Sequence, residues 1–239
     1  MSTTAEVSEA AARYISVEDV AYEPARGLPK ISRKQLLTTD RLQIHQTSIG
    51  GHGDGDGRDC GFLAANSVAY VLSGTAVLEQ ADLAEPKTQL GRGHLMVIPP
   101  GTRRRGTLTV TSDELVLLEV ARALEPADGS EDAAGIRVVD PEAVAAYEPA
   151  GHARTRNRCL FVDEHMEIIE GRIERGGGAD RHSHDSHEQL LYVLSGAGVP
   201  LLIHYPKGAP HGTGGGVPEP LELLVIYSPP LGEAQNALA

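Results

Sequence analysis

The sequence predicts an all-β protein in which two related domains follow one another along the chain. The first observation is an internal repeat of three short blocks. The second is a series of short aliphatic and β-branched runs, each bounded by glycine or proline, which is typical of strands. The third is the content of 27 glycines and 15 prolines in 239 residues, which suits a turn-rich protein and falls short of a disordered composition.

The repeat keeps the order of its blocks in both halves of the chain. A YVLSG block at residues 70–74 recurs 122 residues later, and a YEPA block at residues 22–25 recurs 125 residues later. A third, looser pair consists of IPPG at residues 98–101 and YPKG at residues 205–208. Chance does not readily produce three matched blocks in one order, so we infer a duplicated domain.

The predicted elements are almost all strands. Residues 41–49 and 164–174 alternate between apolar and polar side chains, as half-buried strands do. Helix is expected only near residues 5–12 and 140–146, the latter with Pro141 at a favoured first-turn position. The aliphatic runs that predict further strands are residues 68–74, 95–101, 107–120 and 221–229.

The repeat divides the chain into four parts. The acidic, apolar-poor stretch at residues 123–134 separates the two copies. The second copy is shorter, because 30 residues lie from Gly74 to Arg104 but only 15 from Gly196 to His211. Either this domain is shortened, or the sequence omits a loop. We expect an N-terminal extension at residues 1–35 and a first domain at residues 36–122. A linker with a short helix at residues 123–150 and a second domain at residues 151–239 follow.

Charge and composition exclude several functions. The net charge of −12 disfavours a nucleic-acid surface and gives no electrostatic reason to bind an anionic membrane. No apolar run approaches the roughly 18 residues of a membrane span. The start of the sequence has no apolar core of a signal peptide, and Cys60 and Cys159 make no disulfide framework. We therefore expect a cytoplasmic protein with no nucleic-acid or membrane partner.

A histidine-rich segment of the second copy predicts a metal site. His182 and His184 would project from the same face of a strand, because side chains alternate there. Glu188 and Gln189 follow on or near the next strand, and His211 lies beyond a proline-glycine turn. Two imidazoles and one or two ligands from neighbouring strands can form a mixed nitrogen and oxygen site with open positions, which suits Fe(II), Mn, Ni or Zn.

These residues resemble the two motifs of the cupin superfamily. The first motif, a glycine, five residues, His-x-His, three or four residues, Glu or Gln, six residues and a glycine, runs here from Gly176 to Gly196. The second, a Pro-x-Gly-x-x-His turn, ends at His211. The resemblance implies a bicupin with two jelly-roll-like barrels of the double-stranded β-helix type, usually as a homodimer. Its spacing assigns Gln189 as the fourth metal ligand, with Glu188 as the alternative.

The first copy lacks this ligand set. The same spacing places Cys60, Phe62, Ser67 and Arg104 at the ligand positions. Arginine is always protonated and cannot bind a metal. We therefore expect a degenerate first barrel without a metal. The arginines at residues 103–105 would form either an anion site or a solvated rim.

The resemblance implies an enzyme that acts on a small oxygenated metabolite with one divalent metal per chain. We expect Fe(II) first and an oxygenase or dioxygenase reaction, because mononuclear cupins with open sites commonly activate dioxygen. The alternatives are a non-redox isomerase, cyclase or lyase using Mn, Ni or Zn as a Lewis acid, and a non-catalytic binder of a small molecule. Candidate acid–base residues are Glu188, Tyr192 and His204.

Overall fold

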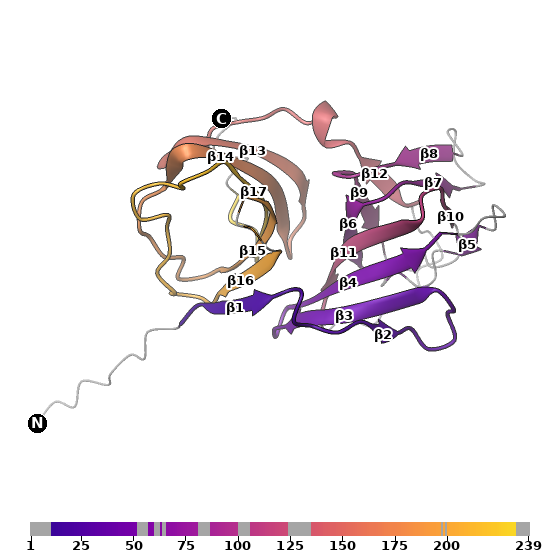
Figure 1. Ribbon diagram of the computed structural model, residues 1–239. Helices are drawn as coiled ribbons and strands as arrows, with labels where there is room; N and C mark the ends of the chain where they lie inside the picture. The colour runs from indigo at the N-terminus through magenta and orange to yellow at the C-terminus, as the bar shows by residue number, and fades with distance from the viewer. Residues whose placement is uncertain are drawn as a thin grey trace, which may run out of the picture. The chain divides into compact units, whose positions relative to one another are not determined.

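The computed structural model is built almost entirely from strands, as the sequence predicts (Figure 1). It describes residues 11–51, 57–59, 63, 66–80, 87–99, 106–123, 135–196, 198 and 200–232. The chain divides into two compact units. The N-terminal unit is Asp19–Val144, and the C-terminal unit combines Ala145–Ala239 with Met1–Glu18. Among the described residues, no helix is long and apolar enough to cross a membrane.

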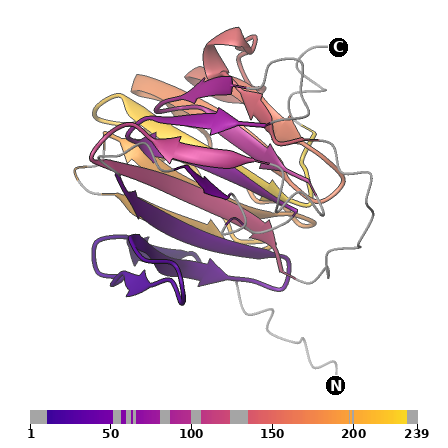
Figure 2. The same ribbon diagram turned by 90° about the vertical axis from the view of Figure 1, so that its right-hand side faces the viewer.

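Two sheets form the N-terminal unit. A seven-stranded sheet has the order β12-β9-β6-β11-β4-β3-β2, and a four-stranded sheet has the order β5-β10-β7-β8. Figure 2 shows β3, β4 and β11 of the larger sheet side by side. The strands are β2 (Glu23–Pro24), β3 (Ile31–Thr38), β4 (Leu42–Gly50), β5 (Arg58–Asp59), β6 (Ser67–Ser73), β7 (Ala76–Glu79), β8 (Lys87–Leu90), β9 (Leu95–Ile98), β10 (Thr107–Val110), β11 (Glu114–Arg122) and β12 (Arg137–Val139).

The core of the N-terminal unit joins its two sheets. Ala69 and Leu117 from the larger sheet pack in one cluster with Leu78 and Leu108 from the smaller sheet, and all four are at most 2% exposed. This burial follows from alternation, because every second residue of a strand faces the same side. The two sheets therefore bury their apolar faces against each other, as in a sandwich or barrel.

One antiparallel sheet forms the C-terminal unit, and it curls into a barrel (Figure 1). Its strand order is β1-β16-β15-β17-β14-β13. Its core includes Ile169, Val193 and Leu223, which are all at most 7% exposed. The strands are β1 (Arg13–Ser16), β13 (His152–Val162), β14 (Glu167–Ala179), β15 (Glu188–Ser195), β16 (Leu201–Tyr205) and β17 (Leu221–Ser228).

In the described part of the C-terminal unit a single sheet is found, whereas the N-terminal unit has two. Strands β15 and β16 pair with each other, as the corresponding β6 and β9 do, but along the chain two further strands, β7 and β8, lie between β6 and β9. Among the described residues of this unit, nothing corresponds to the four-stranded sheet. The second copy is shorter by 15 residues because the residues described between β15 and β16 include no counterpart of β7, β8 and their turns.

The observed boundaries differ from the expected ones near both ends of the first domain. Strand β1 pairs with β16, with Arg13 opposite His204, so part of the expected extension belongs to the C-terminal unit. Strand β12 pairs with β9 and so belongs to the N-terminal unit rather than to a linker. Both pairings join residues far apart in sequence, which local patterns do not reveal.

The helix expected at residues 140–146 is only a short 3-10 turn. It spans Pro141–Ala143, and the Asp140 side chain accepts a hydrogen bond from the Glu142 backbone N–H. Asp140 is thus a cap, and the following segment returns to extended backbone at Val144. The helix expected at residues 5–12 lies mostly outside the described residues.

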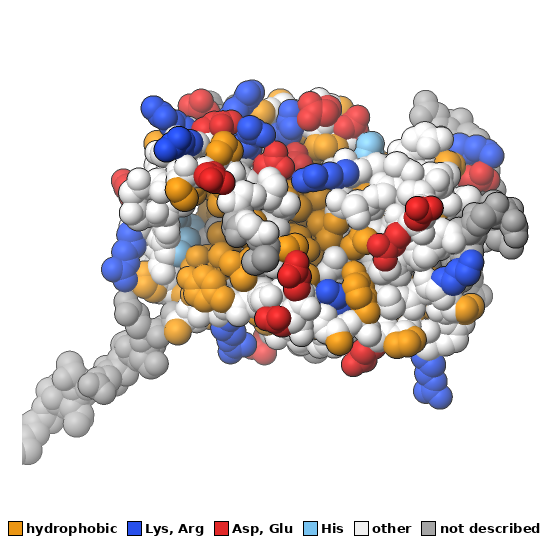
Figure 3. All heavy atoms as spheres, viewed as in Figure 1, with side chains coloured by type: hydrophobic (Ala, Val, Ile, Leu, Met, Phe, Trp, Pro, Cys, Tyr) orange, Lys and Arg blue, Asp and Glu red, His pale blue; other side chains and the backbone are white. Residues whose placement is uncertain are grey.

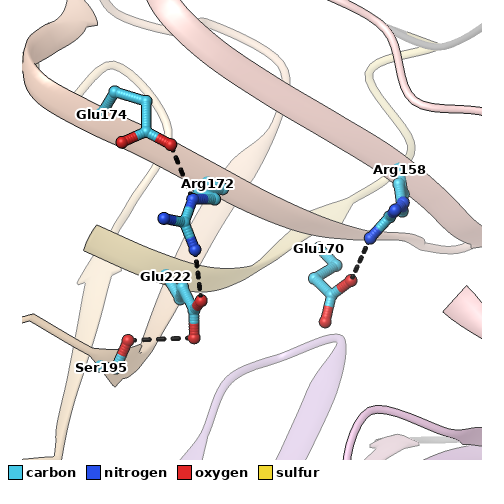
Figure 4. A network of polar contacts seen from close by, with 6 residues as sticks. All are labelled: Arg158, Glu170, Arg172, Glu174, Ser195 and Glu222. Atoms are coloured by element: carbon cyan, nitrogen blue, oxygen red, sulfur yellow. Dashed lines mark hydrogen bonds and ion pairs between the residues drawn. The ribbon is translucent and has the colours of Figure 1, made fainter. Parts of the chain in front are cut away.

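A group of charged side chains lies on the face of the C-terminal sheet that points away from the barrel interior (Figure 4). Arg172 on β14 pairs with Glu174 on its own strand at 2.7 Å and with Glu222 on β17 at 3.0 Å. Arg158 and Glu170 lie opposite each other on β13 and β14, with an ion-pair distance of 3.7 Å. Such surface ion pairs contribute little to stability, because solvent screens them.

Candidate metal centre

Three histidines meet at one end of the C-terminal barrel. His182 and His184 lie between β14 and β15, and His211 follows β16. His182 and His211 form an isolated antiparallel bridge, in which each backbone N–H donates to the carbonyl of the other at 2.8 Å. The possible ligand nitrogens of all three side chains lie within 4.8 Å of one another. That spacing is suitable for three imidazoles around one ion.

Backbone carbonyls orient two of the rings. The Nδ1 atom of His182 lies 2.7 Å from the Asp180 carbonyl, and the Nδ1 atom of His211 lies 2.9 Å from the Ala209 carbonyl. A carbonyl accepts a hydrogen bond, so each Nδ1 carries the proton and each Nε2 keeps its lone pair. Hydrogen bonds of this kind, made by the ring nitrogen that does not bind the metal, fix both the ring orientation and the tautomer of metal-binding histidines.

Burial keeps the imidazoles in the form that binds metals. The pKa of His184 is lowered to about 4. Burial is the largest cause, and electrostatic repulsion from His211 and His182 adds to it. Burial also lowers the pKa of His211. Both rings are therefore neutral near pH 7, and a neutral ring is the form that coordinates a metal.

Gln189 faces the cavity beside these histidines, whereas Glu188 does not. Gln189 is 7% exposed and lines a cavity together with His182 and His211. Successive residues of a strand face opposite sides, so Glu188 points away from that cavity. Its carboxylate Oε2 atom instead lies 3.1 Å from Nε2 of buried His204. Of the two candidates for a fourth ligand, the barrel interior presents the amide.

The donor atoms fit a divalent metal ion. Nε2 of His184, Nε2 of His211 and Oε1 of Gln189 are buried with no hydrogen-bond partner. A buried polar atom without a partner costs about 1–3 kcal/mol, so most such atoms are paired in proteins. Here three of them occur in one candidate site. Coordination would satisfy them, and with His182 they form a neutral set of three nitrogens and one oxygen.

A cavity of about 240 Å³ opens beside the candidate ligands. Its apolar wall includes Ile173, Leu191 and Leu223, and its polar groups include Asn157 and Tyr227. In the space-filling view, histidine side chains are visible in a hollow of this unit's surface (Figure 3). The site therefore combines exposed access with an apolar interior, as small-molecule sites commonly do.

The three acid–base candidates lie on the wrong side of the sheet for this cavity. Leu191, Ile203 and their alternate neighbours line it, so Tyr192 and His204 face the other way, as Glu188 does. All three are buried, and the contact between Glu188 and His204 joins two of them. The sequence shows that side chains alternate between the two faces of a strand. It does not show which of those faces encloses the cavity.

Aromatic residues around the ligands were not foreseen. Tyr205 stacks on His211 with ring centroids 4.6 Å apart, and Tyr227 meets His184 edge-on at 5.6 Å. The ring centroid of His152 lies 6.1 Å from that of His182, and His152 also lines the cavity. Tyr205 directly precedes the second motif, which is a signal that could have identified it. His152 and Tyr227 lie in strands remote from both motifs, and no local pattern marks them.

His187 belongs to the surroundings of the site and is not one of the clustered donors. Its Nδ1 atom lies 2.9 Å from the Pro229 carbonyl, and its ring centroid is 6.3 Å from that of His184. Its proximity is one of several contributions that lower the pKa of His184.

The inner face of the N-terminal unit carries a different polar group. Arg33 contacts the Glu119 carboxylate at 3.3 Å, and Thr47 donates a hydrogen bond to the same carboxylate, which is 2% exposed. Ser67, the one described residue among the four ligand-equivalent positions, is buried. Cys60, Phe62 and Arg104, with the neighbouring arginines at 103 and 105, lie outside the described residues.

No protein-family model and no curated protein matches the sequence. The structure is similar to a Pseudomonas aeruginosa protein described as glyoxylate-induced, with a TM-score of 0.69 and 16% identity over 94% of this chain and 93% of that one. It is also similar to Streptomyces albus HEPD, solved with its substrate 2-hydroxyethylphosphonate and Fe(II), with a TM-score of 0.66 and 10% identity over 98% and 80% of the two chains.

A third similar structure names the fold. It is a cupin 2 conserved barrel domain protein from Leptotrichia buccalis, with a TM-score of 0.52 and 15% identity over 94% of this chain and 100% of that one. At these identities the likeness concerns the fold. The chain is an all-β protein with the fold of the cupin barrels.

Proposed function

We propose that the chain is a bicupin enzyme whose C-terminal unit holds one divalent metal ion on His182, His184, His211 and Gln189. The observation that carries this proposal is the convergence of three imidazoles within 4.8 Å, where buried donor atoms have no protein partner. The strand orders β6-β11-β4-β3 and β15-β17-β14-β13 correspond, which supports a duplication. In this proposal the N-terminal unit retains the barrel fold but binds no metal.

We further propose that the reaction is an Fe(II)-dependent oxygenation of a small oxygenated metabolite. Bound Fe(II) would supply the electron for activating dioxygen, which protein side chains alone do not provide. The chain's own residues would hold the ion and keep it accessible. Backbone carbonyls fix the rings of His182 and His211, and the apolar walls exclude water from the substrate.

The acid–base residues expected from the sequence give no support to an isomerase, cyclase or lyase reaction, which leaves cavity-lining His152 as the candidate base for those alternatives. Those alternatives require a positioned acid or base beside the metal. Glu188, Tyr192 and His204 face away from the cavity. Burial, with a contribution from Tyr14, raises the pKa of Tyr205 to about 12, so this tyrosine does not serve as a base near neutral pH.

Nitric oxide binding to the Fe(II)-loaded protein tests the proposal without knowledge of the substrate. Nitric oxide is a dioxygen surrogate that gives a characteristic electron paramagnetic resonance signal on accessible ferrous iron. We expect this signal from the wild-type protein and its loss in His184→Ala. A wild-type protein that binds Fe(II) and gives no signal would contradict the oxygenase proposal. A protein that binds no Fe(II) would contradict the metal site itself.

A further inference from the structure

The wall of the cavity is without fixed charge. Among the described residues that line it, none is a lysine, arginine, aspartate or glutamate. The apolar side includes Ile173, Leu191, Ile203, Leu223 and Val225. Apart from the imidazole of His152, the metal ion would therefore be the only group of the site available to balance a charge on a bound molecule.

Two hydroxyl groups of the wall are already engaged. Thr155 donates to the Ala153 carbonyl and Thr213 donates to the Ala179 carbonyl, both at 3.1 Å. These hydroxyl protons are committed to backbone acceptors. An anionic group placed against this wall would meet neutral donors such as Asn157 and Tyr227 but no lysine or arginine, in contrast to a site built to bind phosphonate or carboxylate.

The charged residues of the same strand point the other way. On β14, Gly171 and Ile173 line the cavity, whereas Arg172 between them lies in the outer ion-pair network with Glu174 and Glu222 (Figure 4). Strand alternation thus separates guanidinium groups from the cavity. A one-residue shift in register would be needed to bring Arg172 inside.

We propose that the cavity takes a small hydroxy-ketone or enol whose only ionisable group is the oxygen that binds the metal. This inference rests on the proposed metal site. The cavity of about 240 Å³ corresponds to about eight waters at liquid density, so it suits a small ligand. One oxygen meets the ion and the remainder packs on the apolar wall. A carboxylate or phosphonate elsewhere on the molecule would be buried without a cation, which is strongly unfavourable.

Two hydroxypyranones form a matched test. Kojic acid and comenate share the same chelating head and differ at one position, where kojic acid has a hydroxymethyl group and comenate a carboxylate. Each is titrated calorimetrically into the full-length protein loaded with Zn(II), which permits binding without redox turnover. We expect kojic acid to bind at least about 100-fold more tightly than comenate, the scale of an unpaired buried charge. Equal affinities, or a preference for comenate, would overturn the inference while leaving the metal site intact.

A substitution in the wall adds a second test. Ile203 lines the cavity and is only partly buried, so Ile203→Lys can place an ammonium group at the wall while Ile203→Met keeps it apolar. We expect the lysine variant to shift the preference toward comenate by at least about tenfold and the methionine variant to leave it unchanged. Zn(II) content measured after each titration separates the two claims. A wild-type protein that retains no Zn(II) before ligand is added would overturn the metal site and this inference together.

Discussion

Replacing Gln189 by leucine should stabilise the metal-free protein and weaken metal binding at the same time. Oε1 of Gln189 is buried with no hydrogen-bond partner, and the residue is 7% exposed. Leucine has a similar volume, so the change leaves no large cavity. Removing an unsatisfied buried oxygen relieves about 1–3 kcal/mol. For a chain of this size that is about 2–4 °C in melting temperature per kcal/mol.

The same change removes one of four proposed ligands. Loss of a group that only supports a ligand weakens metal binding by about 10–100-fold, so loss of a ligand should cost at least that much. Calorimetric melting of the metal-free protein measures the first effect, and competition with a Zn(II) indicator dye measures the second. Opposite signs for stability and affinity are the signature of a residue held for function rather than for folding.

Glu188→Gln is the matched control for this experiment. The side chain faces away from the cavity and contacts His204, so metal affinity should stay at the wild-type value. Stability should fall by about 1 kcal/mol, because a charged hydrogen bond becomes a neutral one. If Gln189→Leu keeps full metal affinity while Glu188→Gln loses it, the assignment of the fourth ligand is wrong.

Three further predictions concern the histidines and their support. His184→Ala should abolish stoichiometric metal binding without unfolding the protein, as elemental mass spectrometry and circular dichroism would show; full metal content would contradict its role. Because the lowered pKa of His184 is about 4, protons compete weakly with the metal above that value. Zn(II) should therefore remain bound at pH 5.5 in equilibrium dialysis, whereas half-loss near pH 6.5 would indicate an ordinary imidazole. Gly178→Ala should weaken metal binding and cost about 1–3 kcal/mol of stability, because a Cβ at this positive-φ position would lie 2.0 Å from Oγ1 of Thr213, near His211. Gly198→Ala, also at positive φ but with nothing within 4 Å, should leave metal affinity unchanged.

Local patterns were sufficient to predict the fold class and the cluster of histidines. Alternation and the repeated YVLSG block predicted strands that the structure contains at β6 and β15. The spacing of His182, His184 and His211 predicted that they would lie close together, and they do. The first result follows from regularities that operate over a few residues, which a single sequence displays directly, whereas the second rests on the resemblance to the two cupin motifs.

Other features depend on contacts that no local pattern encodes. Alternation separated Glu188 from Gln189 onto opposite faces, but only the curl of the sheet determines which face encloses the cavity. Pairing of β1 with β16 joins residues far apart in sequence, such as Arg13 and His204, which are 191 positions apart. The stacking of Tyr205 on His211 likewise depends on the turn between them folding back. Long-range pairing of this kind is a property of the whole chain.

Metal stoichiometry of the untagged protein is the most direct test of the central claim. The protein is stripped with a chelator, reloaded anaerobically with Fe(II), desalted, and measured by elemental mass spectrometry beside His184→Ala. One metal ion per chain in the wild-type protein and none in the variant is the predicted result, since one unit provides the three imidazoles and the amide. A wild-type protein that retains no metal after loading, or a variant that retains a full equivalent, would contradict the proposed centre.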